Sequence, residues 1–246
     1  MPKTSITADI AAVLGILALL AVVLGPAAIH LGLFSPIRGF VVFAFGSLLG
    51  SLLSFIFGIA GLLRTRPASG RLGRGRAWVG TGVGVFLLLL AGIQLFLGRH
   101  APAIHDVTTN TAFPPMFSDS VRALRIHQNG VDYPDGGPSV PEMQKQAYPD
   151  LTTITLPVPP EVALNHARLA GEQLGWKITR VDPTEGRVEA YDVSRIFMFI
   201  DDIVIRVRPS GTGSSVDVRS SSRVGLGDLG KNAARIRAFR KALLST

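Results

Sequence analysis

Three long stretches without a charged residue occupy the N-terminal part of the chain, and they constrain its fold more than any other feature. They cover residues 10–37, 39–63 and 77–98. Each is long enough to supply the roughly 20 apolar residues that a helix needs to cross the hydrocarbon core of a bilayer. The sequence therefore predicts three transmembrane helices within residues 1–98, which excludes a wholly soluble protein.

The first stretch contains Pro26 and His30, so we expect its spanning part to cover about residues 8–29. A cleaved signal peptide is an alternative, because Pro26-Ala27-Ala28 resembles a cleavage site. The leading segment holds one lysine and one aspartate, and two further stretches follow it. These features favour a retained helix.

The charged residues are distributed unevenly. Residues 1–98 hold 7 of the 25 Lys and Arg residues and 1 of the 17 Asp and Glu residues, so most of the net charge of +8 lies beside the predicted helices. The small excess that remains on residues 99–246 argues against nucleic acid as a partner. The absence of cysteine excludes disulfides, zinc–thiolate sites and cysteine nucleophiles.

Five arginines lie between the second and third stretches, at positions 64, 66, 71, 74 and 76. Short arginine-rich loops stay in the cytoplasm, which places the N-terminus there as well. We therefore expect a multi-pass protein of the inner (plasma) membrane, with residues 99–246 in the periplasm or outside the cell. Binding of anionic membrane lipids is a second role open to the arginine cluster.

Small residues recur at helical spacing in the second and third stretches, at Gly46, Gly50, Ser54 and Gly58 and at Gly80 and Gly84. Such faces let helix backbones approach closely. We expect them to pack the three helices together, with a homodimer as the alternative. No stretch contains Asp, Glu, Lys or Arg, which argues against a channel or a transporter.

Residues 99–151 are rich in proline and should form a segment that wraps over the domain, with short helical turns near 121–127 and 142–146. Residues 152–246 show regular patterns and should form the α+β domain itself. The expected strands are 152–156, 176–181, 187–191, 196–208 and 216–223, and the expected helices are 160–174 and 228–244. The short turns between strands predict an antiparallel sheet with its helices on one face.

Alternation along the strands predicts which side chains face away from these helices. Asp202, Arg206, Arg208, Asp217, Arg219 and Arg223 should share that face, with Lys177, Arg187 and Glu189 as neighbours if their registers follow. Two hypotheses follow. Either these charges form solvated cross-strand pairs, or the arginines form a surface that binds carboxylate or phosphate.

Several segments together resemble a known family. They are IHDVTT (104–109) with FPPMF (113–117), AYPD (147–150), DDIVIR (201–206) and DVRSSSRVGLGDLGKNAARI (217–236). On these residues the region 100–244 is identified as a member of the bacterial family called domain of unknown function 1499. The resemblance implies a domain that often follows membrane helices, and it implies no established activity. Asn110 and Gly227 depart from the family pattern, where an Asp and a polar residue are expected.

The best group of binding residues combines Arg206, Arg219, Arg223, Asp228, Asn232 and Arg235, which strand, loop and helix start should bring together. A structural corner that fixes the last helix is the alternative. Gly225, Gly227 and Gly230 mimic a dinucleotide fingerprint, but no second strand or acidic residue follows to complete it. We expect no metal and no cofactor.

The sequence favours a non-enzymatic membrane protein of the cell envelope. Its domain would bind an anionic envelope component, such as a lipid headgroup or an acidic polymer, or a partner protein. The alternative is an envelope hydrolase or transferase that uses His105 and Asp106, the most plausible acid–base pair in the sequence.

Overall fold

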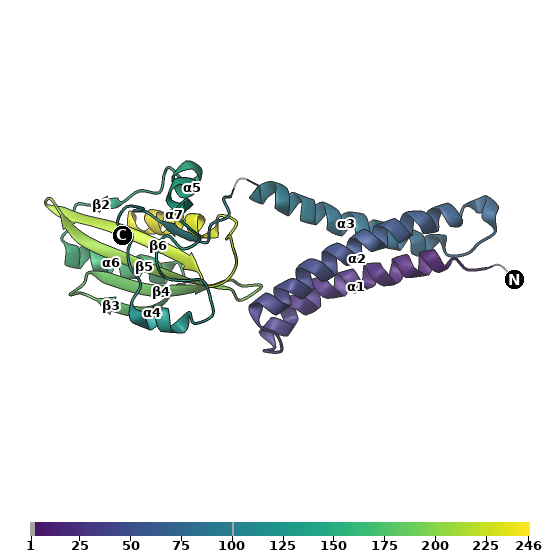
Figure 1. The fold of residues 1–246 in the computed structure, drawn as a ribbon, viewed down its shortest axis with the longest axis horizontal. Helices are drawn as coiled ribbons and strands as arrows, with labels where there is room; N and C mark the ends of the chain where they lie inside the picture. The colour runs from purple at the N-terminus through teal and green to yellow at the C-terminus, as the bar shows by residue number, and fades with distance from the viewer. Residues whose placement is uncertain (1–2, 100) are drawn as a thin grey trace. The chain divides into compact units, whose positions relative to one another are not determined.

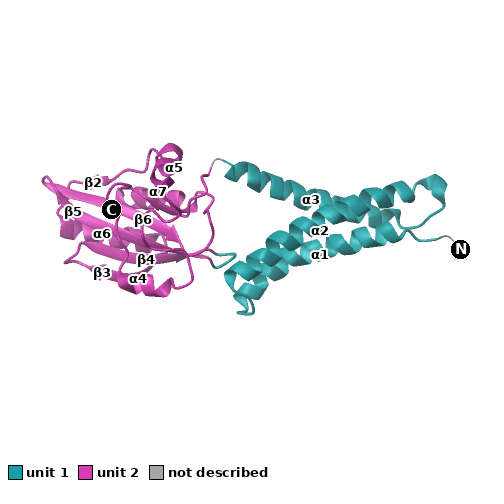
Figure 2. Ribbon diagram, in the orientation of Figure 1, with its two compact units in different colours: residues 1–99, 195–198 teal, residues 100–194, 199–246 magenta. Residues whose placement is uncertain are grey.

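The computed structural model describes residues 3–99 and 101–246. The chain divides into two compact units (Figure 2). The first contains residues 1–99 together with 195–198, and the second contains residues 100–194 and 199–246. Each unit is considered by itself below.

The first unit contains three long helices, α1 (Ile6–His30), α2 (Pro36–Arg64) and α3 (Arg74–Gly98), and a short 3₁₀ helix, η1 (Pro67–Ser69). All three long helices are long and apolar enough to cross a membrane, with mean hydropathies of 2.6, 2.3 and 2.1. The protein is therefore a membrane protein with three candidate spans. Each helix extends a few residues beyond its expected span, because flanking polar residues such as Arg64 and Arg74 continue the helix.

Small residues bring these helices into close contact. A methyl group added at Gly80 would lie 2.6 Å from the backbone of Ala11, and one at Gly58 would lie 2.8 Å from the backbone nitrogen of Thr81. The buried Ser54 hydroxyl lies 2.8 Å from the carbonyls of Ala11 and Gly80, so it satisfies its donor between the other two helices. The small residues thus serve packing within one chain, and the homodimer stays a prediction.

The N-terminal residues pair with the loop between α2 and α3. The Ser5 amide donates to the Leu72 carbonyl at 3.0 Å, and the Leu72 amide donates to the Lys3 carbonyl at 3.2 Å. Arg76 forms a 2.7 Å ion pair with Asp9, the acidic residue of the first turn of α1. The N-terminus and the arginine-rich loop therefore lie at the same end of the helix bundle.

The second unit is built on an antiparallel sheet (Figure 1). Its strands are β1 (Asp106–Thr108), β2 (Ile154–Leu156), β3 (Lys177–Asp182), β4 (Arg187–Val193), β5 (Ile200–Ser210) and β6 (Gly213–Ser222). The order is β1-β6-β5-β4-β3, and β2 follows β1 along the same edge of β6. The expected α+β class with an antiparallel sheet is confirmed.

Two helices, α6 (Pro160–Gln173) and α7 (Lys231–Leu243), pack against one face of the sheet. The main core lies between them and alternate residues of the strands, such as Ile203, Ile205 and Val218. The rings of Trp176 and Phe239 stack within this core, with centroids 5.3 Å apart. Burial of these apolar side chains is the main stabilising contribution to the unit.

Residues 110–135, here called the covering segment, lie over the opposite face of the sheet. The segment contains the short helix α4 (Asp119–Leu124) and is followed by α5 (Val140–Ala147). Phe117, Val121 and Val131 form a small second core with Val204 of β5. The hypothesis of solvated charge pairs on this face is therefore wrong at its centre, where Glu189, Asp202 and Arg219 are buried.

The remaining differences are local. β5 begins at Ile200 rather than at residue 196, because residues 194–199 form a turn closed by the bond from the Ser194 amide to the Phe199 carbonyl. The last helix begins at Lys231, three residues later than expected. Leu229 precedes that helix with a φ of 53° and is 75% exposed, so it lies outside the buried face of α7, which includes Ala233 and Ile236.

Candidate functional site

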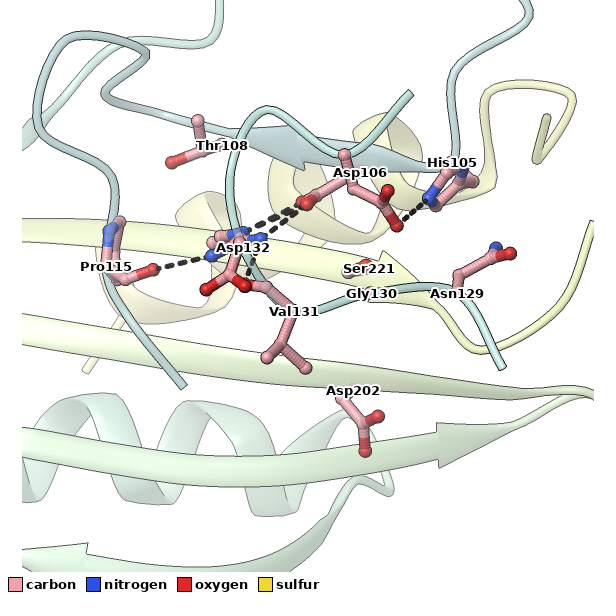
Figure 3. A network of polar contacts seen from close by, with 12 residues as sticks. His105, Asp106, Thr108, Pro115, Asn129, Gly130, Val131, Asp132, Asp202 and Ser221 are labelled. Carbon is pink, nitrogen blue, oxygen red and sulfur yellow. Dashed lines mark hydrogen bonds and ion pairs between the residues drawn. The ribbon is translucent and has the colours of Figure 1, made fainter. Parts of the chain in front are cut away.

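Arg219 anchors the covering segment to the sheet. Its side chain is fully buried and pairs with Asp106 of β1, with Nη2 at 2.6 Å from Oδ2 and Nε at 2.9 Å from Oδ1 (Figure 3). The same guanidinium donates to the carbonyls of Pro115 (3.3 Å) and Val131 (2.8 Å). One side chain thus binds a neighbouring strand and both arms of the covering segment.

Two aromatic rings complete the surroundings of this arginine. Its Cζ lies 4.9 Å from the ring centroid of Phe117 and 5.3 Å from that of Tyr133. Burial, with Asp106 nearby, raises the pKa of the Tyr133 hydroxyl, which keeps it neutral. Every nitrogen of the Arg219 guanidinium donates to an acceptor of the protein, and the side chain is fully buried, so it is poorly placed to bind a ligand.

A second ion-pair group lies beside the first. Asp202 receives two bonds from Arg223, at 2.9 and 2.8 Å, and its Oδ2 lies 3.3 Å from Nε of Arg125. Arg125 also donates to the Ser221 hydroxyl and carbonyl. Burial lowers the pKa of Arg125, and the nearby carboxylate of Asp202 opposes that shift. The carboxylate of Asp202 is therefore shared by two arginines. Arg125 attaches the covering segment to β6, and Arg223 binds Asp202 just beyond the end of β6.

The remaining predicted residues form a separate group at the start of α7. The buried Asn232 amide bonds to the His105 carbonyl and to the Ser220 and Ser222 hydroxyls. Arg235 contacts Asn232, Ser220, Asp192 and Asp201 at 2.6–3.2 Å.

Asp228 prepares the start of this helix. Its carboxylate accepts the amides of Gly230 (2.8 Å) and Asn232 (2.7 Å). Burial raises the pKa of Asp228, and the two amide bonds oppose the shift. The carboxylate therefore satisfies helix-start amides that an anionic ligand would otherwise use.

The six predicted binding residues do not line one site. Arg206, Arg219 and Arg223 bond to partners on the covered face of the sheet, whereas Asn232 and Arg235 reach the sheet from α7 on the other face. The sheet separates the two groups, which corrects the expected convergence. The structural-corner alternative predicts bonds of the kind that five of these residues form, namely Arg219, Arg223, Asp228, Asn232 and Arg235. Their role in ligand binding stays a prediction.

His105 and Asp106 do not form a pair. Nε2 of His105 lies 3.0 Å from Oδ2 of Asp135, while Asp106 is bound to Arg219. Neighbouring residues of an extended chain point to opposite sides, which accounts for the separation. The acid–base pair expected from the sequence is therefore replaced by a His105–Asp135 contact that attaches the covering segment.

Three arginines along β4 and β5 form a further group, and one of them, Arg208, is exposed. Arg187 and Arg206 are directly opposite each other in the β4–β5 register, and Arg208 follows on the same face. They line a cavity of about 200 Å³ with Pro115, Met116, Glu185 and Val204, here called the arginine pocket. Arg187 and Arg208 were noted in the sequence as members of the charged face but not as site residues.

Some hydrogen-bond donors of these arginines are unused. Arg206 binds Asp217 at 2.7 Å and the Pro114 carbonyl at 3.1 Å, while Arg187 pairs with Glu185 and donates to the Met116 carbonyl. Within residues 3–99 and 101–246, the buried Nε atoms of Arg187 and Arg206 have no hydrogen-bond partner. The exposed Arg208 side chain likewise has no ion-pair partner there. The pocket is therefore lined by three guanidinium groups, of which Arg187 and Arg206 each pair with one carboxylate and Arg208 pairs with none in the described part of the chain.

A larger cavity of about 450 Å³ lies between the ends of β1 and β2. It is lined by residues of three segments: Thr109, Asn110, Thr111 and Ala112; Gln144, Lys145, Tyr148 and Pro149; and Leu151, Thr152 and Thr153. Its main polar groups already serve the fold: Thr109 and Thr153 donate to Asp217, and Gln144 bonds the backbone of Thr108. Across the described part of the chain, no cluster of His, Cys, Asp and Glu has an arrangement that could hold a metal ion.

Comparisons with known proteins place the second unit in a family. A solved structure titled "Crystal structure of Ara h 8.0201" matches with 13% identity and covers 38% of this chain and 95% of its own, but its TM-score of 0.21 carries no conclusion about fold. No curated protein matches the chain. The family model described as "Protein of unknown function (DUF1499)" matches residues 106–243, more than half of the sequence. The chain therefore belongs to the DUF1499 family.

Proposed function

We propose that the second unit binds a phosphate or carboxylate group of an anionic envelope component in the arginine pocket. The observation that carries the proposal is the cross-strand pair of Arg187 and Arg206 with Arg208 beside them. Like charges that face each other across strands destabilise a sheet. A bound anion would relieve that repulsion, and the exposed Arg208 guanidinium would be available to hold it.

The other arginines of the covered face are poorer candidates. Arg219 and Arg223 already hold carboxylates in two-point contact, as a ligand would be held. Displacing Asp106 would leave a buried carboxylate without its partner, which is costly. The proposed site therefore retains Arg206 from the sequence-based set and adds Arg187 and Arg208.

The size of the pocket limits the ligand. A volume of about 200 Å³ accommodates one anionic group with a short substituent, not a folded partner. A guanidinium offers paired N–H donors that match the oxygens of phosphate and carboxylate. A phosphate or carboxylate that belongs to a larger lipid or polymer meets both conditions.

The proposed compartment rests on the arginine-rich loop. Arg66 and Arg71 lie in the short loop between α2 and α3, and Arg64 ends α2 beside it, which supports a cytoplasmic location for that loop and for the N-terminus. With three spans, the second unit then lies outside the cytoplasm. Anionic lipids and polymers of the envelope are the partners available there.

The test is titration calorimetry of the full-length protein in a neutral detergent, with inorganic phosphate and with acetate as probes. Arg208→Gln removes an exposed charge without breaking an ion pair, so the fold should persist. A charge-assisted hydrogen bond contributes about 1.5–3 kcal/mol, so the variant should bind roughly tenfold or more weakly.

Lys241→Gln is the matched control, because Lys241 is an exposed cation on α7, which packs on the other face of the sheet. It should leave binding unchanged, and Arg208→Lys should restore part of it. Failure of the wild-type protein to bind either anion would contradict the proposal. Equal losses of affinity in Arg208→Gln and Lys241→Gln would show that binding depends on the net charge of the protein and not on the arginine pocket.

A further inference from the structure

The loop between β6 and α7, residues 223–230, exposes two leucines almost completely. Leu226 is 88% exposed and Leu229 is 75% exposed. Single exposed apolar residues are common on protein surfaces and need no explanation. Two within four residues, at this degree of exposure, form an apolar tip.

The backbone of this loop holds the leucines outward. Gly225 and Gly230 have φ values of 97° and 82°, and Leu229 itself has a φ of 53°, which residues with a side chain rarely adopt. Asp228 fixes the turn by accepting the Gly230 and Asn232 amides. Unusual backbone geometry held by its surroundings is a feature of functional segments.

The residues that contact this loop lie close to the end of α3 in the chain. The Asp228 amide donates to the Ile104 carbonyl at 3.2 Å, and a methyl group at Gly230 would lie 4.0 Å from Cβ of Ala101. Ala101 is only three residues beyond Gly98, the last residue of α3. Three residues of extended chain span about 10 Å at most.

Because the chain between Gly98 and Ala101 is covalent, this limit on their distance applies to any orientation of the second unit. Gly98 ends the apolar span, and headgroup regions add several ångströms to each side of the roughly 30 Å hydrocarbon core. A loop beside Ala101 is therefore within reach of the headgroups. Lys231 follows Leu229 by two residues and is exposed, as is typical where apolar side chains enter an anionic lipid surface.

We infer that the β6–α7 loop inserts Leu226 and Leu229 into the interface of the bilayer that anchors the chain. The occupant of this apolar tip is lipid rather than a second protein. The contact fixes one end of the domain at the membrane surface. It is independent of the arginine pocket, and either proposal can fail without the other.

The test uses single cysteines, because the protein has none of its own. Leu226→Cys places an environment-sensitive fluorophore on the loop. Ser210→Cys is the matched control, because Ser210 is exposed and ends β5 beside the β5–β6 turn, which lies at the opposite end of strand β6 (Figure 1). Both full-length variants are placed in lipid nanodiscs, which leave both membrane faces open to solvent.

The fluorophore at position 226 should be quenched by spin-labelled lipid several-fold more than the one at position 210, and less by aqueous iodide. Equal quenching at the two positions, or strong iodide quenching at 226, would overturn the inference. A fluorophore at 226 that both quenchers fail to reach would also overturn it, since protein would then cover the loop.

Discussion

Arg219 and Asp106 form a fully buried ion pair between β6 and β1, with Nη2 of the arginine 2.6 Å from Oδ2 of the aspartate. The two residues are 113 positions apart in the chain. The pair joins the first strand after the membrane helices to the last strand of the sheet. Because Arg219 also binds the carbonyls of Pro115 and Val131, its loss would release the covering segment as well.

Asp106→Asn should destabilise the second unit strongly. Removing one partner of a buried ion pair leaves an uncompensated charge and typically costs about 3–5 kcal/mol. The effect is measured by urea denaturation of the full-length protein, with proteolytic cleavage within residues 110–135 as the readout. Asp132→Asn is the control, because the Arg122–Asp132 pair is exposed and should contribute little. Equal stability of the two variants would contradict the anchoring role of Arg219.

A second prediction concerns pH. Burial raises the pKa of Asp228 above its ordinary value of 3.8 in the folded protein. The folded state therefore binds this proton more tightly than the unfolded state does, and the resulting stability is complete below pH 3.8. It is lost as the pH rises through the folded-state pKa.

Asp228→Asn removes this titration. The free energy of unfolding of the wild-type protein, taken relative to the variant, should fall as the pH rises above about 4. Denaturation of both proteins across that range, under one set of buffers, gives the difference directly. A relative stability that rises with pH would mean that the amide bonds of Gly230 and Asn232 outweigh burial.

The sequence predicted the parts of this fold that depend on local patterns. Charge-free stretches of more than 20 residues located the three spans. Alternation along β5 and β6 placed Arg206, Arg219 and Asp217 on one face, as the register shows. What covers that face could not be read locally. The covering segment is proline-rich, and it is held by contacts such as Arg219–Val131 and Ser118–Glu189 that join distant residues.

The same limit applies to the site. The arginines were recognised as a group, but the sequence does not tell which of them find carboxylates. Asp106 lies in a strand of only three residues, too short to show a pattern, so its pairing with Arg219 was not expected. The other two arginines of the pocket, 187 and 208, became apparent only once those pairs were known.

The packing of the membrane helices gives a third prediction. Gly80→Ala should weaken the bundle, because the new methyl group would lie 2.6 Å from the backbone of Ala11. Overpacking of this kind costs about 1–3 kcal/mol. Gly82→Ala, two residues along the same helix, meets nothing within 4 Å and should be neutral or slightly stabilising. Unfolding of both variants in mixed micelles of increasing SDS content compares them.

The orientation of the chain gives the last prediction, and it tests the compartment on which the proposed partners depend. Ser210→Cys lies on the second unit, and Ser69→Cys lies in the arginine-rich loop between α2 and α3. A membrane-impermeant thiol reagent applied to intact spheroplasts should label position 210 and spare position 69, because the loop arginines hold that loop in the cytoplasm. After lysis both positions should react, which controls for the accessibility of Ser69→Cys. Labelling of position 69 before lysis, with position 210 spared, would reverse the topology and move the arginine pocket into the cytoplasm. The proposed ligand would then have to come from cytoplasmic phosphates or carboxylates rather than from the envelope.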